Sequence, residues 1–138
     1  MVQILAGEKG VGKTKRLIAM ANEASKEAKG CVVFIDDDNS RMYDLHYSVR
    51  FVDTPKFIME SPQVFKGFVC GILSQNNDIE KVYIDGLNYI MEKINNSEFT
   101  EFICQLNDIS KETETDFTMI ISRKQEELPS EIHPYIIS

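Results

Sequence analysis

The sequence has no tryptophan, only three cysteines and two histidines, and no long hydrophobic run. The cysteines, Cys31, Cys70 and Cys104, are odd in number and far apart, which excludes a disulfide framework and a typical zinc site. We expect them to be buried thiols in a reducing cytoplasm. No stretch approaches the roughly 20 apolar residues of a membrane span, and no signal peptide is visible, so we expect a cytoplasmic protein without a membrane partner.

Positive charge is also scarce. Fifteen Lys and Arg against 22 Asp and Glu give a net charge of -7. An acidic surface repels a phosphate backbone, so the composition disfavours nucleic acid as a partner. The length of 138 residues, 43% hydrophobic, fits a single globular domain over residues 1–138.

What the sequence does contain is a glycine-rich segment near its start that matches the pattern G-x-x-x-x-G-K-S/T without a mismatch. Its glycines allow tight turns that point successive N–H groups at phosphate oxygens. In this pattern Lys13 is expected to reach the β- and γ-phosphates, and the Thr14 hydroxyl to bind Mg²⁺. The expected nucleotide-binding residues are Gly7, Glu8, Lys9, Gly10, Val11, Gly12, Lys13, Thr14 and Lys15.

The flanking residues support a phosphate-binding loop. An apolar run predicts a strand over 2–6, and apolar residues at helical spacing predict a helix over 13–28. The helix would add its positive N-terminal dipole to the same anion site. The alternative is a fortuitous glycine turn that binds no ligand.

Strands and helices alternate along the rest of the chain. Strands are predicted over 31–35, 49–53, 81–85 and 117–122, with an edge strand near 135–137; helices are predicted from Ser61 to 74 and over 98–113, the latter capped by Ser97. This alternation predicts an α/β protein in three layers, with a mostly parallel sheet of five to six strands.

Polar residues follow the carboxyl ends of several predicted strands, at 7–14, 36–39, Asp85 and 122–124. Ligands of such sheets bind at that edge, so we expect one composite site there. Asp85 ends an apolar strand in the manner of a Walker B carboxylate and is expected to hold Mg²⁺ together with Thr14. The acidic cluster at 36–38 is either part of this site or a solvated turn.

These segments resemble RecA-like P-loop NTPases of the ASCE class. Residues 31–38 are similar to that family's second core strand, where Phe-Ile-Asp runs into a catalytic glutamate. Residues 81–85 resemble its Walker B strand, and 117–122 resemble the strand that carries a phosphate-sensing residue. The resemblance covers residues 1–125. The chain also resembles small Firmicute-type ATP-binding proteins of unassigned role, sometimes labelled twitching-motility (PilT-like) ATPases.

The resemblance implies a P-loop NTPase fold with RecA-like strand order, in which strand 117–122 lies between strands 2–6 and 81–85. It implies ATP and Mg²⁺ as cofactors, and catalysis by Lys13 and by Asp38, the carboxylate that acts on water. Asp38 is one methylene shorter than the family's glutamate, and Gly86 leaves the other usual position of that glutamate empty. Hydrolysis is therefore expected to be slow, to need self-association, or to give way to a nucleotide-dependent switch.

The same resemblance places Ser122 and Arg123 near the terminal phosphate, as sensors. Arg123 is alternatively an arginine finger acting on a neighbouring subunit. A third interpretation is a solvated basic pair formed by Arg123 and Lys124.

Three functions follow from these interpretations. The first is a Mg-ATP-binding protein with slow ATPase activity. The second is a small-molecule kinase, which would need a mobile arginine-rich lid, whereas this chain has no arginine cluster. The third is a degenerate domain that binds a nucleotide or a protein partner without catalysis. Whether the protein forms a homo-oligomer or binds an unidentified protein partner stays open in each.

Overall fold

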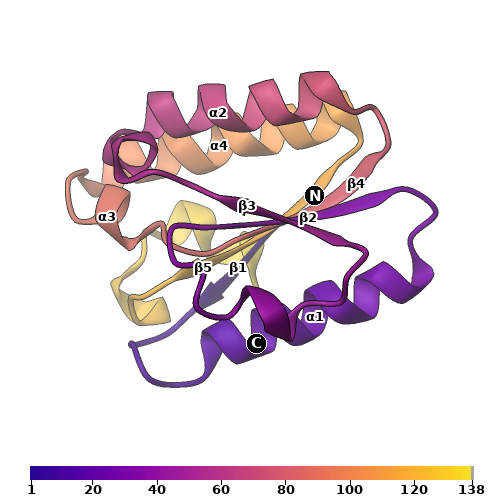
Figure 1. The fold of residues 1–138 in the computed structure, drawn as a ribbon. Coiled ribbons are helices and arrows are strands. Elements are labelled where there is room, and N and C mark those ends of the chain that lie inside the picture. Colours follow the sequence, from indigo (N-terminus) through magenta and orange to yellow (C-terminus); the bar gives the residue numbers. More distant parts are fainter. Residues whose placement is uncertain (138) are drawn as a thin grey trace.

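The computed structural model describes residues 1–137 and has a parallel sheet between two layers of helices (Figure 1). The strands are β1 (Val2–Ala6), β2 (Cys31–Asp36), β3 (Val49–Asp53), β4 (Ile79–Ile84), β5 (Asp116–Ile121) and β6 (Ile136–Ile137). The α-helices are α1 (Lys13–Glu27), α2 (Pro62–Gln75), α3 (Asn88–Met91) and α4 (Asn96–Thr113). Short 3-10 helices are η1 (Met42–Asp44), η2 (Lys56–Glu60), η3 (Gln125–Glu127) and η4 (Ser130–Tyr135).

The six strands lie in the order β3-β2-β4-β5-β1-β6, and all the pairs are parallel. The α/β class and the parallel sheet are therefore confirmed. The position of β5 between β1 and β4 and the presence of a final edge strand are confirmed as well, and this edge strand, β6, lies beside β1. Since parallel neighbours need long crossovers, helices connect the strands and cover both faces of the sheet.

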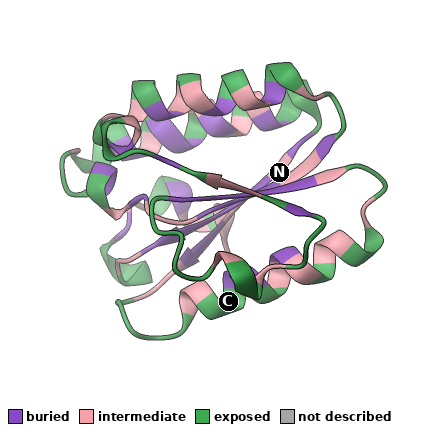
Figure 2. Ribbon diagram, in the orientation of Figure 1, coloured by how far each residue is buried: buried purple, intermediate pink, exposed green. Residues whose placement is uncertain are grey.

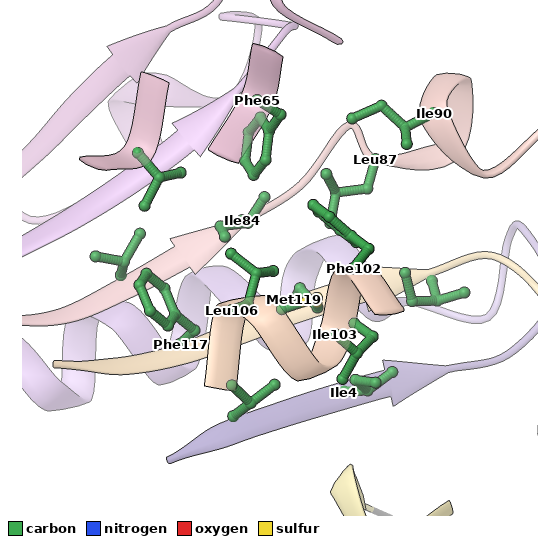
Figure 3. Packing of buried hydrophobic residues seen from close by; sticks show 14 of the residues in the cluster. Ile4, Phe65, Ile84, Leu87, Ile90, Phe102, Ile103, Leu106, Phe117 and Met119 are labelled. Carbon is green, nitrogen blue, oxygen red and sulfur yellow. The ribbon is translucent and has the colours of Figure 1, made fainter. Parts of the chain in front are cut away.

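Two hydrophobic cores lie on the two faces of the sheet. Helix α1 covers one face, whereas α2 and α4 lie side by side on the other (Figure 1). The central strands are buried, while the outward sides of the helices are exposed (Figure 2). On the α2 and α4 side, Phe65 and Phe102 pack with their ring centroids 6.2 Å apart (Figure 3). The strands are hydrophobic on both faces because both faces are covered.

The cysteine prediction is wrong for the helical thiols. Cys70 and Cys104 are exposed, and Cys31 is only partly buried. Each helical cysteine directly follows a buried residue, Val69 or Ile103, and a helix turns by about 100° per residue, so the thiol points away from the core. None of the described helices has the length and apolar composition needed to cross a bilayer.

The first turn of α4 differs from the prediction, since Asn95 rather than Ser97 is the N-cap. The Asn95 side chain accepts a hydrogen bond of 2.8 Å from the Glu98 amide, and the Glu98 carboxylate accepts one of 3.1 Å from the Asn95 amide. This reciprocal capping box satisfies two N–H groups at the helix start. The Ser61 cap of α2 is confirmed, because its hydroxyl accepts from the Val64 amide at 3.1 Å.

The capping box predicts that Asn95→Ala lowers the free energy of unfolding by about 1 kcal/mol, because it leaves the Glu98 amide without its acceptor. The matched control, Ser97→Ala, lies on the exposed side of the same turn and should stay within about 0.5 kcal/mol of wild type. Urea denaturation followed by circular dichroism measures both. A larger loss for Ser97→Ala would contradict the assignment of the cap.

Candidate functional site

The segments that follow β1, β2, β4 and β5 meet at the carboxyl edge of the sheet, as predicted. Two adjoining cavities open there, of about 490 and 450 Å³. Residues of the glycine-rich loop line the first, together with Asp85 and Ser122. The acidic segment after β2 lines the second, which also includes Asp85. The segments that the sequence places at this edge therefore border two adjoining cavities.

The glycine-rich loop turns directly into α1. Gly12 is the N-cap of this helix with φ of 84°, a left-handed conformation that is costly for residues with a side chain. Lys13, the first helical residue, donates from Nζ to the carbonyl oxygens of Gly7 at 2.7 Å and Glu8 at 2.6 Å. The loop therefore curls around the lysine ammonium at the N-terminus of a helix of 15 residues, where an anion is favoured.

Thr14 and Asp85 contact each other across the site. The Thr14 hydroxyl donates to Asp85 Oδ2 at 2.8 Å, and the Gly86 amide donates to Asp85 Oδ1 at 2.7 Å. The hydrogen bond between Thr14 and Asp85 connects the loop after β1 to the end of β4, although β5 lies between the two strands. Thr14 and Asp85, which are both expected to hold Mg²⁺, therefore lie in direct contact.

The side-chain oxygens of Thr14 and Asp85 are suitable ligands for Mg²⁺. No group of three or more His, Cys, Asp or Glu side chains in the described chain is arranged to hold a metal ion by itself. Magnesium usually takes one or two carboxylates and completes its shell with water and phosphate oxygens. The Thr14 hydroxyl and the Asp85 carboxylate, beside a cavity of about 490 Å³, match that requirement.

Asp36 belongs to the acidic cluster at 36–38, but the sequence alone did not distinguish it from Asp37 and Asp38. It is the last residue of β2 and only 7% exposed. Burial, the nearby charge of Asp85 and contact with Asp37 raise the pKa of Asp36 to about 8, against a partial lowering by the hydrogen bond from the Asp38 amide. Its carboxyl group is therefore largely protonated at neutral pH. The pairing of β2 with β4 was the signal that could have identified it.

Asp37 occupies space beside Gly86. A Cβ atom added at Gly86, whose φ is 90°, would lie 2.7 Å from Asp37 Oδ1. The position after Asp85 lacks a side chain, and a carboxylate from the segment after β2 fills the space that one would take. The structure thus brings an acidic side chain to the place that the sequence left empty.

Asp38 is fully exposed and lines the second cavity. Its carboxylate accepts a hydrogen bond of 2.9 Å from the Ser40 amide, and its interactions with Ser40 lower the pKa of Asp38. The carboxylate is therefore ionised near neutral pH and caps its own turn. The acidic cluster therefore forms a turn and also lines the second cavity.

Ser122 and Arg123 are placed differently. Ser122 lines the first cavity, and its amide donates to Asn88 Oδ1 at 3.2 Å. Arg123 donates to the Met91 carbonyl oxygen at 2.7 Å and is not among the described residues that line either cavity. Lys124 forms an ion pair of 3.3 Å with Glu8 of the glycine-rich loop. Neither basic residue is thus simply solvated.

Asn88 and Arg41 line both cavities and were not predicted as site residues. Asn88 lies at the start of the short helix α3, and Arg41 lies in the segment after the acidic cluster. Neither belongs to a recognisable pattern. Only the meeting of loops that are distant in sequence shows their position.

The raised pKa of Asp36 predicts that stability depends on pH. Its folded-state pKa of about 8 exceeds that of an unfolded aspartate, so its contribution is fully present below about pH 4 and is lost as the pH rises through about 8. Asp36→Asn cannot ionise and should lose less thermal stability than wild type between about pH 6 and about pH 9. Melting followed by circular dichroism in EDTA measures this. The control Asp108→Asn, an exposed site on α4, should show the same dependence of melting temperature on pH as wild type. The same dependence in Asp36→Asn would contradict the raised pKa of Asp36.

No protein-family model matches the chain, and no curated protein has a significantly similar sequence. The interpretation of the site therefore depends on its own geometry. That geometry consists of a glycine-rich loop at a helix N-terminus, a threonine hydroxyl bonded to a carboxylate, and two adjoining cavities.

Proposed function

We propose that the chain binds ATP with Mg²⁺ at the first cavity and hydrolyses it slowly, as a RecA-like P-loop NTPase. The observation that carries the proposal is the hydrogen bond of 2.8 Å from the Thr14 hydroxyl to the Asp85 carboxylate, beside a cavity of about 490 Å³. In a P-loop site these two side chains hold the metal that bridges the phosphates. The observed strand order, with β5 between β1 and β4, agrees with the order that the resemblance implies.

Each part of the site has a role in this proposal. The amides of the loop cradle the phosphates, and Lys13 exchanges its two carbonyl contacts for phosphate oxygens. Thr14 and Asp85 would hold Mg²⁺, which neutralises charge on the phosphates when it is bound. Ser122, at the end of β5, lines the same cavity and is the proposed sensor of the terminal phosphate.

Hydrolysis needs a carboxylate beside the attacking water. The water oxygen forms a bond to the γ-phosphorus, the bond to the β,γ-bridging oxygen breaks, and the electron pair leaves with ADP. The carboxylate takes the water proton and releases it to solvent, so the products are ADP, phosphate and one proton. Asp38 and Asp37 both line the second cavity and are the candidates for this base.

A kinase is the second candidate, because the second cavity adjoins the first and has a volume of about 450 Å³. That is enough space for a small acceptor molecule. ADP formation that requires an added acceptor would favour the kinase, whereas phosphate release from ATP alone favours the ATPase. Binding without turnover in either assay would indicate a domain that does not catalyse.

Lys13→Ala tests the phosphate loop. The variant should lose most of its affinity for Mg-ATP while its melting temperature without ligand stays near that of wild type, because Lys13 lies on the cavity surface. Mg-ATP at about 100 times its Kd should stabilise wild type by about 2.7 kcal/mol. Differential scanning fluorimetry measures the shift. Equal shifts in both proteins would overturn the assignment of the loop.

The two carboxylates are tested by Asp38→Asn and Asp37→Asn, with Asp108→Asn as a control outside the site. We expect Asp38→Asn to keep the ATP affinity and to lower kcat by about 10²-fold or more, since a general base acts only in the transition state. Phosphate release at saturating Mg-ATP measures kcat. Loss of activity in Asp37→Asn alone would move the role to Asp37, and unchanged activity in both would refute a carboxylate base at this cavity.

A further inference from the structure

Arg41 lies where the two cavities meet. It lines both of them, together with Lys9, Thr14, Asp85 and Asn88. Among the described residues that line these cavities, Arg41 is the one cationic side chain that does not come from the phosphate loop. It follows the acidic segment after β2, and the carboxylates of that segment line the second cavity.

We propose that Arg41 contacts the terminal phosphate of the bound nucleotide from within the same chain. The proposal rests on the function proposed above and adds a residue that the P-loop pattern does not contain. The boundary between the first cavity and the second cavity is where a terminal phosphate would meet the attacking water. A guanidinium at this boundary would bind two oxygens of the terminal phosphate at once, in the planar geometry that suits a phosphate group.

The segment that carries Arg41 is held in place independently of the arginine. On α1, the Asn22 side chain donates to the Asp44 carbonyl oxygen at 3.0 Å and accepts from the His46 amide at 2.7 Å. Figure 1 shows this segment beside α1. Because α1 begins at the phosphate loop, the same helix positions the loop and the segment that carries Arg41.

The guanidinium itself is bound only weakly. Arg41 forms an ion pair of 3.0 Å with Asp44, and the two side chains are 47% and 55% exposed. Exposed pairs of this kind contribute little to stability, so a phosphate can replace Asp44 as the partner of Arg41 at little cost. Arg123, the predicted finger, instead donates to the Met91 carbonyl oxygen within its own fold.

In the hydrolysis reaction Arg41 neither gives nor takes a proton. It stabilises the negative charge on the terminal phosphate oxygens while the bond from water forms and the bond to ADP breaks. Arginine fingers that do this contribute about 10³–10⁵ in kcat, and they can act in cis.

The test compares Arg41→Ala, Arg41→Lys and the control Arg50→Ala, an exposed arginine on β3 that lines neither cavity. Titration calorimetry with Mg²⁺ measures the affinity for ADP and for the imido analogue of ATP. Arg41→Ala should lower the affinity for the ATP analogue about tenfold or more, as expected for the loss of a charged hydrogen bond. It should change the affinity for ADP by less than about twofold. It should also lower kcat by about 10³-fold. Arg41→Lys should recover only part of the analogue affinity, and Arg50→Ala should match wild type.

Other outcomes overturn the proposal in distinguishable ways. Unchanged analogue affinity in Arg41→Ala, or equal weakening of ADP and the analogue, would show that Arg41 does not contact the terminal phosphate. If a mixture of Lys13→Ala and Arg41→Ala regained activity, the arginine would act in trans rather than in cis. If wild type bound neither nucleotide, the proposed function itself would fail.

Discussion

The register between β2 and β4 places two carboxyl groups side by side at the edge of the sheet. Ile35 pairs with Ile84, so the next residues, Asp36 and Asp85, are neighbours, and the Asp85 amide donates to the Ile35 carbonyl oxygen at 2.8 Å. Two carboxylates this close cannot both be ionised without a large cost unless a cation lies nearby. The raised pKa of the buried Asp36 favours its protonated form, while Asp85 accepts the hydrogen bond from Thr14.

The order of the strands determines which groups meet around that pair. β5 lies between β1 and β4, so the loop after β1 must reach across the end of β5 to place Thr14 on Asp85. Ser122 follows β5 and therefore lies at the same cavity as the loop. The segment after β2 adds Asp37 and Arg41 from the other side. Each contribution comes from a loop, while the buried strands fix where the loops begin.

The sequence was sufficient for the local features of this arrangement. Glycine spacing identified the loop from Gly7 to Thr14, and apolar periodicity located β1 and β3 at their observed bounds. The strand order came only from a resemblance. The position of Asp85 was predictable because an apolar strand that ends in a carboxylate is a local pattern.

Other features were not predictable because they depend on contacts between distant segments. The raised pKa of Asp36 follows from register, and the approach of Asp37 to Gly86 follows from the packing of two loops. The direction in which Arg123 points depends on the end of α3, where the Met91 carbonyl oxygen accepts its hydrogen bond. The exposure of Cys70 depends on the rotation of α2 about its own axis. An error of one residue in the predicted apolar stripe changes which side chains are expected to face the core.

The two hydrogen bonds of Asn22 have a consequence for local unfolding. They attach the backbone at Asp44 and His46 to the middle of α1, although the segment itself has only the short 3-10 turn η1 as regular structure. A segment fixed in this way opens together with the helix that holds it rather than as an independent loop. In the exchange of amide protons with solvent, the chain between β2 and β3 and the helix α1 would therefore behave as one cooperative unit.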